Sequence, residues 1–125
     1  MTTIKLMVLD ENAEFLESLQ QYAQIIPEVR VLDVTTNVSK VVELYKGDDP
    51  DVIFYASGLI KALGPDTFNE MKAKWPEALF YRLTLFDESF YDEFALNKGF
   101  EGSVPRSRIE HHFERVIDAV KASRD

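Results

Sequence analysis

The chain contains no cysteine, only two histidines and a single tryptophan. The absence of cysteine excludes disulfides, a thiol nucleophile and cysteine-ligated zinc, and it is typical of a reducing compartment. No apolar run approaches the ~20 residues that cross a bilayer. No charged segment followed by an apolar one opens the chain, as it would in a signal peptide. We therefore expect a cytoplasmic protein with no membrane span.

Motifs for common chemistry are also missing. The sequence has no glycine-rich phosphate loop of the Rossmann or P-loop kind, and no nucleophile elbow. His111 and His112 are adjacent, so they would point about 100° apart on a helix and could not form a metal-binding pair. Ser57 has no histidine base near it in sequence. We therefore expect a protein that is not an enzyme.

Positive charge is scarce, with 14 Lys and Arg against 22 Asp and Glu and a net charge of -8. Such a balance repels phosphate backbones, so direct nucleic-acid binding is not expected. The length of 125 residues fits one domain, 1–125, with a core that needs no disulfide or metal staple.

Apolar segments with strand character alternate with segments of helical periodicity. The expected strands are residues 4–9, 29–34, 51–55, 78–85 and 101–104. The expected helices are residues 12–26, a short one ending at 47, 65–75, 87–98 and 107–120. This alternation predicts an α/β fold in which a parallel sheet is covered by helices on both faces.

The segment from Pro50 to Gly58 organises the prediction. Residues 51–55 read as a strand buried on both faces, which stops at Ala56. Ligands in parallel α/β sheets sit beyond the carboxyl ends of the strands, and there this strand offers only a methyl group. The following residues, 58–64, are predicted as a loop, and Pro65 suits the first position of a helix.

Polar residues follow three other strands. Asp10 and Glu11 follow the first strand, Thr84 ends the fourth and Arg106 follows the fifth. Adjacent acids at such a position can hold a hard divalent cation through their oxygens. The alternative is that they are solvated acids beside a helix N-terminus, where negative charge is favourable.

These residues resemble the pattern of response-regulator receiver domains over almost the whole chain. The acidic pair is similar to the family's metal-binding acids, Thr84 to its signalling threonine, and Arg106 stands at the position of its basic residue. Gly64 and Gly99 fall where the pattern has glycines. The resemblance implies a flavodoxin-like (βα)5 three-layer sandwich with a five-stranded parallel sheet in strand order 2-1-3-4-5.

The sequence departs from that pattern at the residues that carry its chemistry. The phosphoacceptor aspartate falls at Ala56, the lysine at Arg106 and the aromatic switch residue at Ser103. Alanine cannot form an acyl phosphate, and arginine is a larger, planar donor than lysine. The chain therefore resembles a pseudo-receiver that requires no cofactor and binds Mg²⁺ weakly at best.

The expected output is regulation through a protein partner or an output domain in two-component-like signalling. Phe90 and Phe94, four residues apart, would form an apolar patch on the face made by the fourth helix, fifth strand and fifth helix, where a homodimer could form. Alternatively, both rings complete the core. Two other functions stay open: a receiver with a displaced acceptor at Asp51 or Asp66, and a small-ligand or metal sensor.

Overall fold

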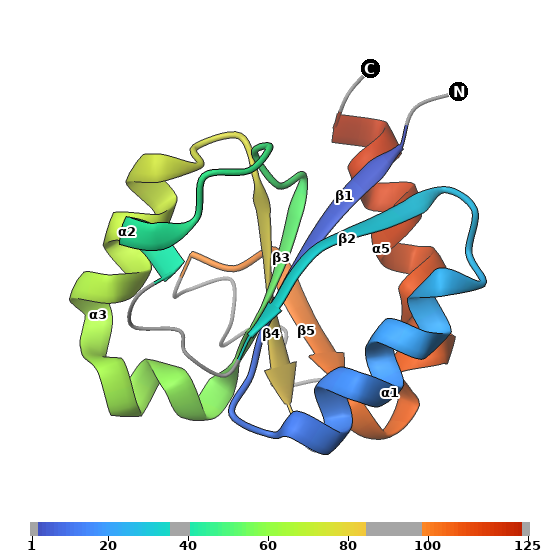
Figure 1. The fold of residues 1–125 in the computed structure, drawn as a ribbon, viewed down its shortest axis with the longest axis horizontal. Helices are drawn as coiled ribbons and strands as arrows, with labels where there is room; N and C mark the ends of the chain where they lie inside the picture. The colour runs from blue at the N-terminus through green and yellow to red at the C-terminus, as the bar shows by residue number, and fades with distance from the viewer. Residues whose placement is uncertain (1–2, 36–40, 85–98, 124–125) are drawn as a thin grey trace.

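The computed structural model in Figure 1 describes residues 3–35, 41–84 and 99–123. The elements follow one another as β1 (Ile4–Leu9), α1 (Ala13–Gln24), β2 (Val29–Thr35), α2 (Val41–Leu44), β3 (Val52–Ala56), α3 (Ser57–Lys74), β4 (Leu79–Thr84), β5 (Gly102–Pro105), the 3-10 helix η2 (Arg106–Arg108) and α5 (Ile109–Ser123). Within these ranges no helix is both long enough and apolar enough to cross a membrane.

The sheet has five strands in the order β2-β1-β3-β4-β5, and every pairing is parallel. Figure 1 shows α1 and α5 on one face of the sheet and α2 and α3 on the other. The expected three-layer architecture and strand order are therefore confirmed. Because all strands run the same way, their carboxyl ends meet at one edge, which is the lower edge in Figure 1.

Strand β3 lies at the centre and is buried along its whole length. Successive side chains of a strand point to opposite faces, and its two aromatic residues follow that rule. Phe54 packs with α1 and α5, making edge-to-face contacts with Tyr81 and Phe113 at centroid distances of 6.2 and 6.0 Å. Tyr55 packs on the α3 side, 5.8 Å from the ring of Phe68. Strand β3 thus contributes side chains to the hydrophobic cores on both faces of the sheet.

Helix α3 begins earlier than the sequence predicts. The expected loop over residues 58–64 is wrong, because α3 starts at Ser57 and runs to Lys74 with Pro65 in its interior. Leu59 supplies a physical reason, since it is 3% exposed and packs in the core formed with Tyr55. Burial of such a side chain contributes about 1.5–3 kcal/mol, which offsets much of the ~3 kcal/mol cost of an interior proline. Consequently β3 leads directly into a helix.

Two lysines at the end of α3 tie neighbouring segments to it. Lys72 Nζ donates to the carbonyl of Gly99 at 3.0 Å and lies 5.0 Å from the ring centroid of Phe80. Lys74 Nζ donates to the carbonyls of Val42 and Tyr45 next to α2.

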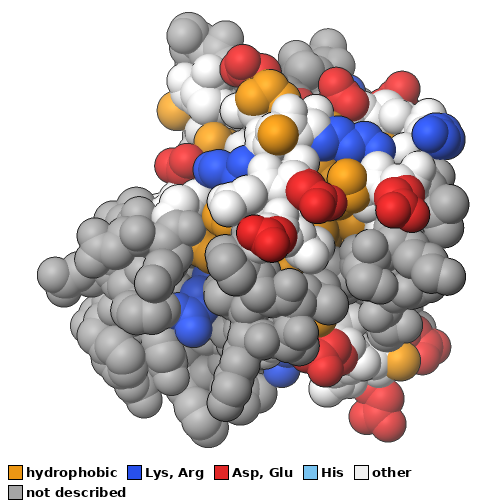
Figure 2. Space-filling model, turned by 90° about the vertical axis from the view of Figure 1, so that its left-hand side faces the viewer, with side chains coloured by type: hydrophobic (Ala, Val, Ile, Leu, Met, Phe, Trp, Pro, Cys, Tyr) orange, Lys and Arg blue, Asp and Glu red, His pale blue; other side chains and the backbone are white. Residues whose placement is uncertain are grey.

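Figure 2 shows this side of the molecule, where acidic, basic and apolar side chains are interspersed over the described surface. In this view no extended patch of one charge sign stands out among the described side chains.

Tyr55 gives the fold a dependence on alkaline pH. Burial raises the pKa of its phenol to about 12 from 10.0, and the hydroxyl finds no hydrogen-bond partner within the described part of the chain. The folded state therefore holds this proton more tightly than the unfolded chain. Stability from this group is complete below pH 10 and is lost as pH rises toward 12.

We expect Tyr55→Phe to have nearly the wild-type free energy of unfolding at neutral pH. Between pH 10 and 12 the free energy of unfolding of wild type should fall by about 1–2 kcal/mol more than that of the variant. The measurement is urea unfolding across the alkaline range. Tyr45→Phe is the matched control, because the Tyr45 hydroxyl donates to the carbonyl of Asp48 at 2.7 Å. Its loss should be about 1 kcal/mol at neutral pH. An equal neutral-pH loss in both variants would contradict the assignment of an unpartnered hydroxyl to Tyr55.

Candidate functional site

Four of the residues singled out in the sequence stand at the carboxyl ends of four strands. Asp10 follows β1, Ala56 ends β3, Thr84 ends β4 and Arg106 follows β5. The strand register aligns them, since Thr84 lies opposite Pro105, the residue before Arg106. We call this edge of the sheet the rim. It is the edge at which parallel α/β sheets bind ligands.

Asp10 is the charged centre of the rim, and its side chain is fully buried. Arg106 Nη2 donates to Oδ1 at 3.0 Å, and Arg106 Nε lies 2.9 Å from Oδ2 in a charge contact. The backbone N–H of Asn12 also donates to Oδ1, at 2.9 Å. A buried carboxylate is tolerated only with such a counter-charge and hydrogen bonds. Oδ1 of Asp10 is therefore hydrogen-bonded within the protein, whereas Oδ2 has the charge contact with Arg106 but no hydrogen bond among the described residues.

Arg106 reaches Asp10 from the junction between β5 and α5. It opens η2, immediately before α5 begins at Ile109. Its guanidinium lies over the ring of Phe15 in α1, 5.6 Å from the ring centroid, in cation–π geometry. The side chain is 21% exposed. One arginine thus connects the start of α1 with the start of the last helix.

Glu11 turns to a different neighbour. It is exposed, and its Oε1 lies 3.1 Å from the place where a Cβ on Gly58 would stand. Gly58 lies in the first turn of α3, where the helix dipole favours a negative charge. A larger residue at 58 would press on this carboxylate. The acidic pair is therefore divided, with Asp10 joined to Arg106 and Glu11 set against α3.

Ala56 occupies the position between β3 and α3. It is fully buried and acts as the N-terminal cap residue of α3, with φ -63° and ψ 138° and no side-chain cap hydrogen bond. Its register partner is Leu83 in β4, and the preceding residue, Tyr55, pairs with Leu9. Ala56 is thus the β3 residue next to Asp10 across the sheet. Its methyl side chain can neither accept phosphate nor ligate a cation.

Thr84 and Ser103 are the other two polar residues singled out near the rim. They are 3% and 6% exposed, on β4 and β5 respectively. The backbone carbonyl of Ser103 accepts from Arg115 Nη2 of α5 at 2.9 Å. The same Nη2 lies 3.1 Å from His112 Nδ1. At the switch position the structure therefore has a small buried hydroxyl next to a strand–helix tie, where the resemblance implies an aromatic ring.

With Asp10 paired to Arg106, the described residues of the rim do not fit a magnesium centre. Mg²⁺ takes oxygen ligands in near-octahedral geometry, and within residues 3–35, 41–84 and 99–123 no group of three His, Cys, Asp or Glu side chains is placed to hold a metal ion. Of the two acids predicted for this purpose, Asp10 contacts Arg106, and Glu11 is exposed with its carboxylate beside Gly58. No carboxylate stands at Ala56 to complete a ligand set.

Part of this arrangement was not anticipated. The sequence pattern predicts Arg106 at the rim, but neither its pairing with Asp10, 96 residues away, nor its stacking on Phe15. A signal was present in the exchange of lysine for arginine, since a guanidinium matches a carboxylate with two donors. Phe90 and Phe94 lie outside the described residues.

Comparisons with known proteins concern the fold of the chain. No family model matches the chain. A transcriptional regulatory protein, DegU of Brevibacillus brevis, is 24% identical over 118 residues, which are 94% of this chain and 49% of DegU. The chain thus spans about half the length of this curated relative.

Solved structures are similar over almost the full chain. The receiver domain of the Francisella response regulator 1452 superposes with a TM-score of 0.76 at 13% identity, covering 97% of this chain and 99% of that one. This chain has the receiver-domain fold. A complex of the P1 domain of CheA3 with CheY6 from R. sphaeroides also contains a similar chain, with a TM-score of 0.73, 15% identity and coverage of 98% and 99%. Asp10, Ala56 and Arg106 therefore occupy the rim of a receiver-like sheet.

Proposed function

We propose that this chain is a pseudo-receiver, a receiver-like domain that takes no phosphate and regulates a partner by binding it. The observation that carries the proposal is Ala56 at the end of β3, fully buried at the position that the resemblance assigns to the acceptor. Its methyl group has no nucleophilic atom. Two-component-like signalling is the setting that the resemblance implies, and no enzymatic step is proposed.

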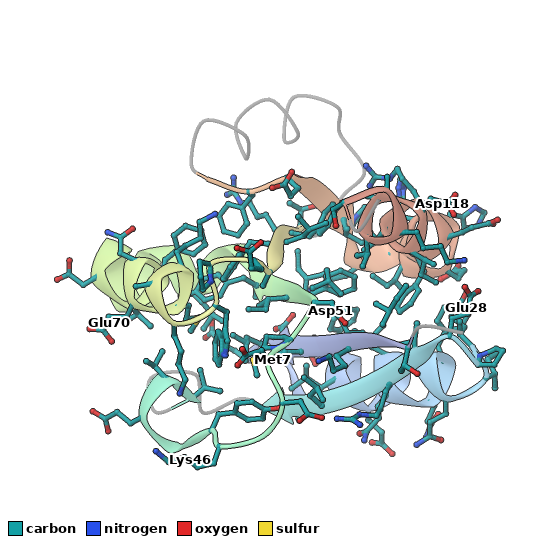
Figure 3. All side chains as sticks on the ribbon, turned by 90° about the horizontal axis from the view of Figure 1, so that it is seen from above. Met7, Glu28, Lys46, Asp51, Glu70 and Asp118 are labelled. Carbon is teal, nitrogen blue, oxygen red and sulfur yellow. The ribbon has the colours of Figure 1, made fainter. Side chains whose placement is uncertain are left out.

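The alternative acceptors lie away from the rim. Asp51 precedes β3, at the opposite end of the sheet, and its Oδ2 accepts the backbone N–H of Lys5 at 2.8 Å. Figure 3 views the molecule from that opposite end and shows Asp51 near the middle, between the helical layers. Asp66 is exposed on α3, nine residues after Ser57 and so about 13 Å along the helix. Both positions favour the pseudo-receiver over displaced acceptor chemistry.

The partner is proposed to be a protein or an output domain. The complex of CheA3 P1 with CheY6 shows that a chain of this fold can dock a protein, and DegU, about twice as long, is described as a transcriptional regulator. In this chain we propose β5 and α5 as part of the contact, either with a partner or with a second copy. The net charge of -8 opposes contact with a phosphate backbone, so no direct nucleic-acid binding is proposed.

The proposal predicts that the wild-type chain takes up no phosphate from acetyl phosphate with Mg²⁺, because no acceptor stands at the rim. Intact-protein mass spectrometry gives the measurement, and a receiver with an acceptor aspartate in the same tube is the positive control. A phosphate adduct on the wild-type chain would overturn the proposal. Peptide mapping would then decide whether Asp51 or Asp66 carries it.

A further inference from the structure

A buried carboxylate at the rim needs a positively charged partner, and in this chain that partner is an arginine side chain. Asp10 is fully buried; its Oδ1 accepts a hydrogen bond from Arg106 Nη2 at 3.0 Å, and its Oδ2 lies 2.9 Å from Arg106 Nε in a charge contact without hydrogen-bond geometry. Paired guanidinium and carboxylate groups neutralise each other at short range. A divalent cation approaching Asp10 would have to displace this guanidinium first.

The surroundings favour the arginine over a cation. Arg106 also lies over the ring of Phe15, and the backbone N–H of Asn12 donates to Oδ1 of Asp10. Glu11, the second acid that a cation would use, faces the first turn of α3 at Gly58 instead. The rim thus has one acid with a fixed counter-charge and one acid with a different neighbour.

We infer that Arg106 is a built-in counter-ion that takes the place of a divalent cation at the rim and keeps this domain metal-independent. The inference deepens the proposed function, because a domain without phosphate chemistry still retains the buried acid of the receiver-like rim. Since Arg106 joins the start of α1 to the start of α5, neutralising Asp10 also links these two helices without an external ligand. The guanidinium of Arg106 thus stands at Asp10, where a cation would otherwise bind.

Thermal unfolding in EDTA and in millimolar Mg²⁺, at matched ionic strength, tests the inference. The melting temperature of wild type should not respond to Mg²⁺. Arg106→Gln should melt roughly 10 °C lower in EDTA, because Asp10 remains buried without its counter-charge. Mg²⁺ should then restore several degrees through binding to the uncovered acid. Arg30→Gln, which removes an exposed arginine paired with Asp48, is the control and should remain insensitive to Mg²⁺.

A double variant keeps the test decisive where Arg106→Gln alone does not fold. Asp10→Asn with Arg106→Gln removes both charges, so it should melt above Arg106→Gln and show no response to Mg²⁺. A rise in the wild-type melting temperature with Mg²⁺ would overturn the inference, as would a folded Arg106→Gln variant that ignores Mg²⁺ or a double variant that responds to it. None of these outcomes depends on phosphate uptake, so the labelling experiment and this one can fail separately.

Discussion

Asp10→Ala is expected to lower the free energy of unfolding by about 3–5 kcal/mol. The substitution leaves the mostly buried guanidinium of Arg106 without its carboxylate and removes the acceptor for the Asn12 N–H. Breaking a buried ion pair by removing one member is far more destabilising than breaking an exposed one, because the remaining charge is only partly rehydrated. Urea unfolding followed by circular dichroism gives the measurement.

The matched control is Asp48→Ala. Asp48 Oδ2 lies 2.5 Å from Arg30 Nη2, and the two side chains are 60% and 55% exposed. Removing this carboxylate should change stability little, because water already solvates both partners. Equal losses in the two variants would show that burial does not set the contribution of the Asp10 contact, which would then stabilise the protein no more than an exposed ion pair.

Ala56→Asp is expected to destabilise the protein by about 3 kcal/mol and to leave it unphosphorylated. Ala56 is fully buried, and its neighbours in the same core are apolar, among them Leu9 and Leu59. A carboxylate placed there lies in the row next to Asp10, so the rim would gain a second buried acid with only one arginine nearby. We therefore expect that an aspartate at position 56 is not sufficient for phosphorylation.

Ala56→Asn separates the effect of charge from that of size, because the asparagine side chain has nearly the same shape as aspartate but carries no charge. We expect it to lose clearly less stability than Ala56→Asp in urea unfolding. Acetyl phosphate labelling of Ala56→Asp with Mg²⁺ gives the second measurement, with no adduct expected, since Arg106 occupies the oxygens of Asp10. Efficient labelling of Ala56→Asp would show that the arginine yields to a cation once the acceptor is present.

The described part of the fold was largely predictable from local patterns. Apolar strands such as residues 4–9 and 51–55, separated by amphipathic helices, leave few arrangements once connections are short and right-handed. The strand order, given by the resemblance, agrees with the observed sheet. The error over residues 58–64 has a local cause. Gly58 and Gly64 mark a turn when composition alone is weighed, whereas burial of Leu59 favours a helix from Ser57 onward.

The pieces of the rim were also evident from the sequence, because Asp10, Ala56, Thr84 and Arg106 each end or follow a strand, and parallel strands bring those ends together. Which of them touch was not evident. A contact between Asp10 and Arg106 spans 96 residues, and no periodicity or spacing specifies side-chain geometry over that distance. The division of Asp10 from Glu11, adjacent in the chain, likewise depends on where α1 and α3 begin.

The sequence by itself therefore determined the βα alternation, the parallel sheet and the lack of a carboxylate at position 56, because these depend on local propensity and on residue identity. Only the tertiary structure decided that Arg106 neutralises Asp10, that Glu11 faces α3 and that β3 runs directly into a helix. The physical reason is that the charge pairing and burial of a side chain depend on the residues around it in the folded protein. Those surroundings are assembled from strands and helices far apart in the chain.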